Sequence, residues 1–202
     1  MLNDQTNLIG NKVQLRDIQL DDFLELYQLT YGEEKPEWKN WDAPYFPLKP
    51  ISFEEFQEGM RERIEDTIEP RTRMIIQSNN EIIGIVSYYW EHKPSNWLEI
   101  GIVIYKPDYW NGGFGTESLR LWIQYLFIEF SLVRIGLTTW SGNVRMMKVA
   151  EKLGMKLEGQ IRKCRLHDGI YYDSIRMGIL REEWNEKKLG DNAISLRRME
   201  RD

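Results

Sequence analysis

The sequence contains very few of the residues that build disulfide frameworks and metal cages. Its 202 residues include one cysteine, Cys164, and two histidines, His92 and His167. A single thiol excludes an internal disulfide, and so few thiol and imidazole groups argue against a structural metal site. No apolar run approaches the roughly 18 to 20 residues that cross a bilayer, and the N-terminus has no basic region followed by an apolar stretch. We therefore predict a cytoplasmic protein with no metal ion and no membrane partner.

No internal repeat, low-complexity tract or flexible linker divides the chain. With 42% hydrophobic and 29% charged residues it has an ordinary globular composition, and at this length about 70% of the surface of the unfolded chain can be buried. We expect a single domain over residues 1–202. The segment 182–202 mixes charged residues with Trp184, Leu189, Ile194 and Leu196, and is expected to be either a frayed end or the contact of a homodimer.

Charge is unevenly distributed along the chain. The formal net charge is −5, but residues 1–70 carry 16 acidic and 7 basic side chains, whereas the remainder carries 16 acidic and 20 basic ones. The acidic first third would suit a cationic partner and the mildly basic remainder an anionic one; an ordinary solvated surface is the alternative. Neither part has the dense basic stripe of a nucleic-acid-binding protein, so we expect no nucleic-acid partner.

Hydrophobic periodicity and capping signals predict an alternation of strands and helices. Strands are expected at residues 13–16, 74–78, 82–90, 97–104, 134–140, 155–165 and 171–180. Helices are expected from 21 or 22 to 30, from the capping box of Ser52 and Glu55 to Pro70, from 116 to about 130, and from 143 to 153. This order predicts a mixed sheet with helices on its faces. Cys164 is expected to be a small buried residue of its strand.

The long stretch 32–51 has no clear periodicity. It contains Trp38, Trp41, Tyr45 and Phe46 among four prolines. So many aromatic residues in a proline-broken loop indicate a segment that folds back over a site, or one that simply covers the core.

A glycine-rich loop connects a predicted strand to the amphipathic helix that follows it. Gly112, Gly113 and Gly115 come just at the start of this helix. Glycines there let backbone N–H groups converge at the positive end of the helix dipole, which is how proteins bind phosphate; a tight turn is the alternative. No lysine follows the last glycine, as a nucleotide P-loop requires. Ser118 and Ile135 stand where a dinucleotide-binding fingerprint needs a glycine and an acid.

Three segments carry a family resemblance: Leu98–Ile102 (LEIGI), the aromatic-x-x-G-x-G-T-E loop Trp110–Glu117, and the helix Asn143–Met155. In order and spacing they resemble the GNAT N-acetyltransferases, specifically the RimJ/RimL branch of ribosomal-protein N-terminal acetyltransferases. The resemblance covers about residues 12–184 and leaves 185–202 as a C-terminal tail. It implies a single-domain α/β (mixed α+β) GNAT-like fold, with a central mixed, mostly antiparallel sheet of about seven strands and helices on both faces.

The resemblance also implies that acetyl-CoA is the cofactor. Backbone amides of the glycine loop would bind its pyrophosphate, and its pantetheine arm would lie where two neighbouring strands separate, close to Asn143. Arg145 and Lys148 would bind the adenosine 3′-phosphate or the outer pyrophosphate oxygens, or else lie on a solvated helix face. The cofactor-binding residues implied are Ile102, Val103, Ile104, Asn111, Gly112, Gly113, Phe114, Gly115, Thr116, Asn143, Arg145 and Lys148.

The implied reaction is direct transfer of acetyl to a primary amine in a ternary complex, without a covalent enzyme intermediate. Such a transfer needs a base for the amine, and Glu99 is the candidate; a purely structural, paired carboxylate is the alternative. Glu91 and His92 are second choices. A backbone N–H near Ile102 or Val103 would stabilise the oxyanion.

The implied acceptor groove includes the acidic and aromatic loop after the first helix. Its candidate residues are Trp38, Trp41, Asp42 and Tyr45, with Glu91 beside them. An acidic, aromatic wall suits a protonated amine. A peptide N-terminus, a polyamine, an amino sugar and an amino acid all qualify as acceptors.

The sequence departs from the family pattern at two positions. Ala150 stands where many members have a tyrosine that protonates the thiolate, and Met146 stands where this branch often has a serine. Another tyrosine or water would then be the acid, or the protein is a non-catalytic acyl-CoA-binding or regulatory module. The tyrosines concerned are Tyr88, Tyr89, Tyr171 and Tyr172.

Overall fold

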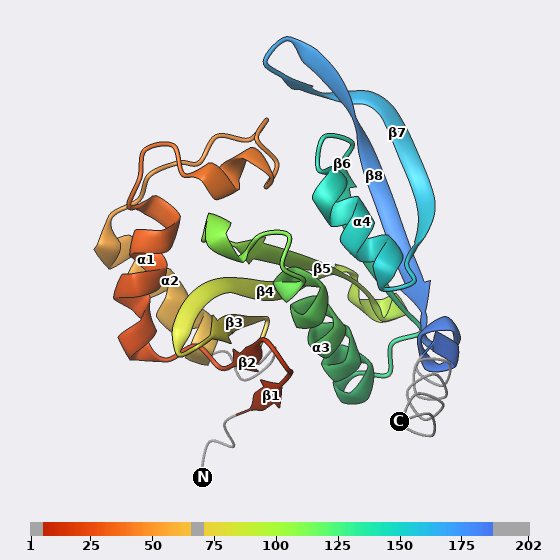
Figure 1. Ribbon diagram of the computed structural model, residues 1–202, viewed down its shortest axis with the longest axis horizontal. Helices are drawn as coiled ribbons and strands as arrows, with labels where there is room; N and C mark the ends of the chain where they lie inside the picture. The colour runs from red at the N-terminus through yellow and green to blue at the C-terminus, as the bar shows by residue number, and fades with distance from the viewer. Residues whose placement is uncertain (1–5, 66–70, 188–202) are drawn as a thin grey trace, which may run out of the picture.

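The structure is a computed structural model that describes residues 6–65 and 71–187. Its centre is an eight-stranded sheet of order β1-β2-β3-β4-β5-β6-β8-β7 (Figure 1). The strands are β1 (Asn7–Ile9), β2 (Gln14–Arg16), β3 (Arg73–Ser78), β4 (Glu81–His92), β5 (Trp97–Ile104), β6 (Arg134–Trp140), β7 (Lys156–His167) and β8 (Ile170–Leu180). Neighbours are antiparallel except β5 and β6, which are parallel. The predicted mixed, mostly antiparallel sheet is confirmed.

β1 is a strand that the sequence pattern does not predict, so the sheet has eight strands rather than about seven. It is three residues long and pairs with β2 alone. Only its middle residue, Leu8, packs against the core. A strand this short at a sheet edge has too few residues for an alternating pattern to be recognised.

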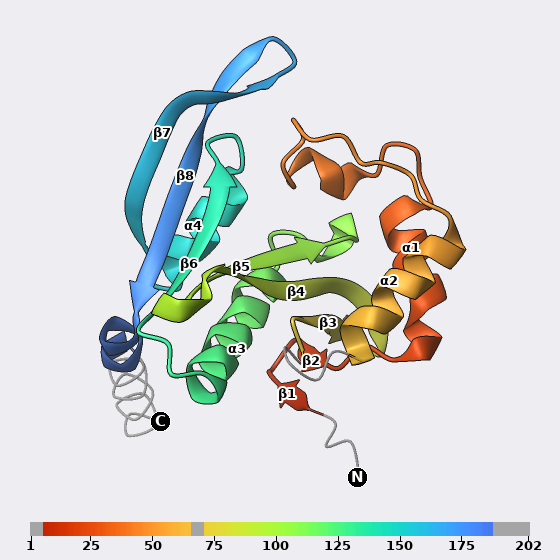
Figure 2. The ribbon, with the colours of Figure 1, turned by 180° about the vertical axis from the view of Figure 1, so that it is seen from behind.

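Helices cover both faces of the sheet, as predicted (Figures 1 and 2). On one face α1 (Phe23–Tyr31) and α2 (Phe53–Glu65) pack around Phe23, Met60 and Trp38; on the other, α3 (Phe114–Glu129) and α4 (Val144–Lys152) pack around Trp122 and Ala150. The predicted end of the second helix at Pro70 lies outside the described residues. No helix in the described ranges is long and apolar enough to cross a membrane.

Residues 181–187, after β8, are also helical. Trp184 is buried there and packs against Phe127 of α3, with ring centroids 6.4 Å apart. This tryptophan therefore belongs to the core. Leu189, Ile194 and Leu196, expected at a frayed end or a dimer contact, lie outside the described residues.

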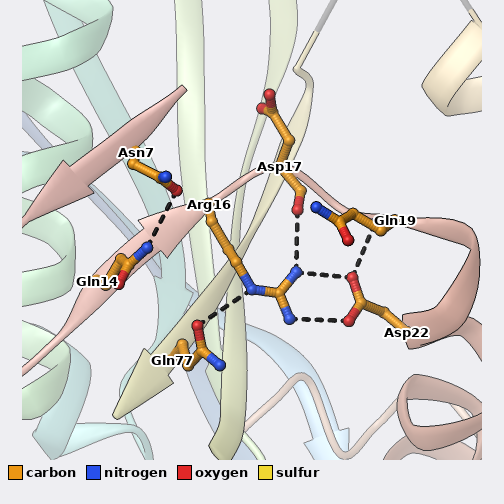
Figure 3. A network of polar contacts seen from close by, with 7 residues as sticks. All are labelled: Asn7, Gln14, Arg16, Asp17, Gln19, Asp22 and Gln77. Carbon is orange, nitrogen blue, oxygen red and sulfur yellow. Dashed lines mark hydrogen bonds and ion pairs between the residues drawn. The ribbon is translucent and has the colours of Figure 1, made fainter. Parts of the chain in front are cut away.

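Arg16 anchors the start of the first helix to the sheet (Figure 3). Its guanidinium donates to the two carboxylate oxygens of Asp22 at 2.7 and 2.8 Å and to Oε1 of Gln77 at 3.1 Å. The hydrogen bonds to Asp22 raise the pKa of Arg16 above its usual value. Asp22 also accepts the backbone N–H of Gln19 at 2.7 Å. These contacts tie β2, β3 and the short turn before α1 together.

β7 and β8 form a long hairpin that extends beyond the rest of the sheet (Figures 1 and 2). Its register shifts between Ile161 and Arg165, where Lys163 has a φ of 53°. Cys164 lies in this irregular segment and is exposed, so the expectation of a buried thiol is wrong. No residue of β7 is buried, because the hairpin extends beyond the rest of the sheet, so a small side chain there has no core to enter.

Candidate active site

The strands β5 and β6 separate partway along β5 and open a cleft. They are paired over Trp97–Glu99, and beyond Glu99 β5 continues to pair with β4 on its other side (Figure 2). The cleft has a volume of about 480 Å³ and is lined by Ile100–Ile104 of β5 and Thr138–Trp140 of β6. Backbone groups of β5 that face this gap can pair with an extended ligand arm, as an added strand would.

The glycine-rich loop leads into the first turn of α3 at one end of the cleft. Gly113 is the N-cap residue and has a φ of 87°, a conformation that favours glycine. It has no side chain to cap the first turn, so N–H groups there can bind an anion at the positive end of the helix dipole. A Cβ built on Gly115 would lie 3.7 Å from Cδ1 of Ile102, so the start of the helix packs closely on β5. This is the geometry of a phosphate cradle.

Four of the six loop residues implied in phosphate binding line the cleft: Asn111, Gly113, Gly115 and Thr116. Gly112 and Phe114 are not among the residues that line it. Phe114 packs edge-on against Tyr109 with ring centroids 5.0 Å apart, and a Cβ on Gly112 would collide with the Phe114 ring at 2.7 Å. Gly112 and Phe114 therefore shape the loop without lining the cleft.

The aromatic loop 32–51 is fastened to the opposite side of the cleft through Trp41. The backbone carbonyl of Trp41 accepts hydrogen bonds from Nε1 of Trp140 at 3.1 Å and from Nδ2 of Asn143 at 2.9 Å. Oδ1 of Asn143 accepts the N–H of Met146 at 3.0 Å and so caps α4. Because Asn143 also lines the cleft, one side chain holds the loop, starts a helix and faces the ligand space.

Arg145 lies between two indole rings beside the cleft, and its expected phosphate contact stays a prediction. Its guanidinium carbon is 4.0 Å from the ring centroid of Trp41 and 4.7 Å from that of Trp110. It lines the cleft, and its Nη1 is buried with no hydrogen-bond partner among the described residues. Lys148, further along the same helix, is exposed where it lines the cleft. Both cations thus remain available to an anionic ligand.

Glu99 is buried where β5 and β6 begin to separate, with 2% of its surface exposed. Its Oε2 accepts a hydrogen bond from the hydroxyl of Tyr89 at 2.8 Å, and its Oε1 accepts one from Nη1 of Arg176 at 3.2 Å. Oε1 of Glu91 lies 3.7 Å from the same arginine nitrogen. Burial and the contact with Glu99 raise the pKa of Tyr89 well above its usual value. Glu99 is thus a carboxylate held by two donors beside the cleft, not a residue of its lining.

The aromatic residues expected at the acceptor side, Trp38, Trp41 and Tyr45, all line the cleft. Trp38 is anchored by donating its Nε1 hydrogen to the carbonyl of Leu29 at 3.2 Å, and Tyr45 packs edge-on against Trp140 with ring centroids 6.2 Å apart. Within the described ranges Asp42 is the single acidic residue of the lining. The expected acidic wall is therefore mainly aromatic; Glu91 is not part of the lining and lies beside Arg176.

Two residues at the site, Trp140 and Arg176, are not predicted from the sequence. Trp140 carries a weak signal, since it ends a strand directly before the Asn143 motif. Arg176 has no sequence signal, because β8 comes close to Glu99 of β5 only through the pairing of β8 with β6. Of the four tyrosines considered as acids, none is part of the lining in the described chain.

Comparison with known proteins decides the family. A family model described as an acetyltransferase (GNAT) domain matches residues 12–156, well over half of the chain. The chain belongs to the GNAT acetyltransferase family. The predicted superfamily is thereby confirmed.

Individual GNAT relatives are similar over most of their length. The SPbeta prophage-derived uncharacterized N-acetyltransferase YokL of Bacillus subtilis is 28% identical over 177 residues, which are 87% of this chain and 93% of the relative. The spermidine N(1)-acetyltransferase of Escherichia coli is 24% identical over 87% of this chain and 89% of its own. A solved structure of RimL, a ribosomal L7/L12 α-N-protein acetyltransferase in complex with coenzyme A, matches with a TM-score of 0.71 at 17% identity, covering 87% and 98%. This last likeness shows the fold.

The residues of the cleft fit coenzyme A. The unpaired stretch of β5 suits an amide-bearing arm, and the helix start beyond Gly113, with no side chain in the cradle, suits a pyrophosphate. Arg145 and Lys148 supply positive charge at the same cleft.

Proposed function

We propose that this GNAT protein transfers the acetyl group of acetyl-CoA directly to a primary amine within a ternary complex. The observation that carries the proposal is the separation of β5 from β6 next to an uncapped, glycine-started helix. The cofactor supplies an acetyl group activated as a thioester. The protein binds and orients this group and handles the proton of the amine.

Binding is assigned to the backbone of Ile102–Ile104 for the arm and to the loop 111–116 for the pyrophosphate. Asn143 adds an amide group at the arm; one of its hydrogen bonds already goes to Trp41, and its remaining N–H is free to serve the ligand. Gly112 and Phe114 contribute through backbone groups and through the shape of the loop. Arg145 and Lys148 are assigned to the phosphates of the adenosine end.

Glu99 is assigned as the base that accepts the proton of the attacking amine, directly or through a water molecule. Arg176 orients one of its carboxylate oxygens and Tyr89 the other. A backbone N–H of Ile102 or Val103 stabilises the negative charge that develops on the acyl oxygen. Water is the assigned acid for the departing thiolate, because the four candidate tyrosines lie off the cleft lining. A thiol has a modest pKa, so little acid assistance is required.

The acceptor is assigned as a protonated amine that meets Asp42 and the aromatic side chains Trp38, Trp41 and Tyr45. Glu91, which lies beside Arg176, is assigned as a further acceptor-binding residue. Aromatic faces and one carboxylate together attract an alkylammonium group. A polyamine deserves the first trial, since a relative similar over 87% of this chain is a spermidine N(1)-acetyltransferase. A peptide N-terminus, an amino sugar and an amino acid remain in the set to be tried.

The remaining predictions concern the domain, the compartment, the partners and the family branch. The chain is assigned as one domain over residues 1–202, in the cytoplasm, with neither nucleic acid nor membrane as partner. Membership of the RimJ/RimL branch stays a prediction, since the sequence relatives are N-acetyltransferases of several kinds. A homodimer likewise stays a prediction.

Incubating the protein with acetyl-CoA and a panel of amines, while detecting free thiol and acetylated product by mass spectrometry, tests the proposal. We expect stoichiometric thiol and acetylamine with at least one member of the panel. Binding of CoA without turnover on polyamines, peptides, amino sugars and amino acids would instead favour a non-catalytic acyl-CoA-binding module. The missing family acids at Met146 and Ala150 are the observation behind that second candidate.

A further inference from the structure

The turn between β1 and β2 places a lysine beside the glycine loop, next to Gly113 of the cleft lining, although Lys12 itself is not among the residues that line the cleft. The side chain of Lys12 reaches the glycine loop, where its Nζ donates a hydrogen bond to the backbone carbonyl of Gly112 at 2.8 Å. A Cβ atom built on Gly113, the N-cap residue of α3, would lie 3.8 Å from the same nitrogen. The ammonium group therefore stands beside the uncapped N–H groups of α3, although Lys12 is about 100 residues away in sequence.

The backbone of Lys12 is held in place by a residue of α3. The carboxylate of Glu117, in the first turn of α3, accepts the backbone N–H groups of Asn11 and Lys12, the latter at 3.1 and 3.2 Å. The Nζ of Lys12 lies over the ring of Phe114, 5.6 Å from the ring centroid. The turn and the start of α3 thus form one unit, so the position of the ammonium is set before any ligand binds.

The carboxylate of Glu117 makes a nearby cation favourable for the binding of an anion at the start of α3. Glu117 places a negative charge in the first turn of α3, next to the N–H groups assigned to the pyrophosphate. Within the described residues no carboxylate lies within 4.0 Å of the Lys12 ammonium, which donates its hydrogen bond to the backbone carbonyl of Gly112. An ammonium has three donors, so two remain for a ligand.

We propose that Lys12 is a phosphate-binding residue, delivered by the β1–β2 turn to the pyrophosphate end of the cleft. It offsets the charge of Glu117 and donates to a phosphate oxygen that the N–H groups of α3 also bind. The inference rests on the proposed function, because the phosphate in question is that of the CoA cofactor. It also gives the short edge strand β1 a role, since β1 and β2 together hold the turn.

Isothermal titration calorimetry of CoA and of 3′-dephospho-CoA, with wild type and three variants, tests the proposal. Lys12→Gln removes the charge but keeps an N–H donor for the Gly112 carbonyl. Lys12→Arg keeps the charge. Lys156→Gln removes an equal charge from an exposed residue at the start of β7, outside the cleft lining. Each titration is run at about 20 mM and about 500 mM salt, since screening weakens an exposed ion pair.

We expect Lys12→Gln to weaken both ligands by about fivefold to tenfold at low salt, with a smaller difference at high salt. Lys12→Arg and Lys156→Gln should stay within about twofold of wild type. Unchanged affinity in Lys12→Gln, or a loss that is the same at both salt concentrations, would overturn the phosphate contact and leave a structural bond to Gly112. A loss for CoA but not for 3′-dephospho-CoA would overturn the assignment to the pyrophosphate. Failure of the wild type to bind CoA would overturn the proposed function itself, and this inference with it.

Discussion

Replacing Glu99 by glutamine should abolish most turnover while leaving CoA binding and the fold nearly intact. A glutamine has the shape of the glutamate, and its side-chain oxygen can still accept from Arg176 while Tyr89 accepts from its amide group. The change therefore removes the basic carboxylate without leaving a hole in the sheet. Since Glu99 lies beside the cleft and not in its lining, the affinity for CoA should stay within about twofold.

The magnitudes follow from the surroundings of the carboxylate. Loss of a general base typically costs 10²- to 10⁴-fold in rate, so we expect kcat to fall by about 100-fold or more. The ion pair with Arg176 contributes modestly to stability, because the arginine side chain is 39% exposed and solvent screens it. A loss of about 1 kcal/mol would lower Tm by about 2 to 4 °C at this chain length.

The matched comparison is Glu91→Gln, which removes a second carboxylate facing the same nitrogen of Arg176 but keeps Glu99. Because Glu91 is assigned to acceptor binding, this variant should change the KM for the amine more than kcat. Steady-state kinetics with the best acceptor, a CoA titration and a melting curve should be recorded for both variants. Turnover of Glu99→Gln equal to wild type would refute its role as the base. A fall in CoA affinity as large as the fall in kcat would show that the variant acts through the structure.

Two further substitutions test the phosphate cradle and the contacts of Arg181 at the end of α3. Gly113→Asp puts a negative side chain in the phosphate cradle and should abolish CoA binding measured by calorimetry. The control is Gly169→Asp, at a φ of 76° in an open hairpin turn, which should bind CoA as the wild type does. Equal CoA binding by both variants would refute the cradle. Arg181→Met removes hydrogen bonds of 2.6 to 2.8 Å to three backbone carbonyls at and after the end of α3. The free energy of unfolding in urea should therefore fall by about 2 to 4 kcal/mol. The control is Arg162→Met, at an exposed residue, and equal stabilities of the two variants would contradict this expectation.

The elements with strong local signals could be predicted from the sequence. The strand rich in β-branched residues that becomes β5, the glycine loop and the apolar face of α3 are each encoded within about 20 residues, so composition, periodicity and capping rules locate them. The helix expected over 143–153 is likewise found, with Asn143 as its N-cap and Val144 as its first residue.

Contacts between distant segments could not be predicted in the same way. The carbonyl of Trp41 meets Asn143 across 102 positions, and Arg176 meets Glu99 across 77, and both contacts arise only once the sheet order is set. Cys164 is exposed because the hairpin that carries it extends beyond the rest of the sheet, and that extension has no local signal in the sequence. Lys12 is part of a turn beside a strand too short to recognise, so its approach to the glycine loop had no local signal.

The central claim is that the cleft between β5 and β6 binds acetyl-CoA, and thermal melting with and without this compound tests it most directly. At about 100 times the dissociation constant, the ligand should stabilise the fold by about 2.7 kcal/mol, which raises Tm by roughly 5 to 11 °C at this chain length. We expect this rise in Tm with acetyl-CoA and with CoA, but not with adenosine triphosphate at the same concentration. No shift with acetyl-CoA at saturating concentration would contradict it, because the cleft and its glycine loop would then be features of the fold that bind no cofactor.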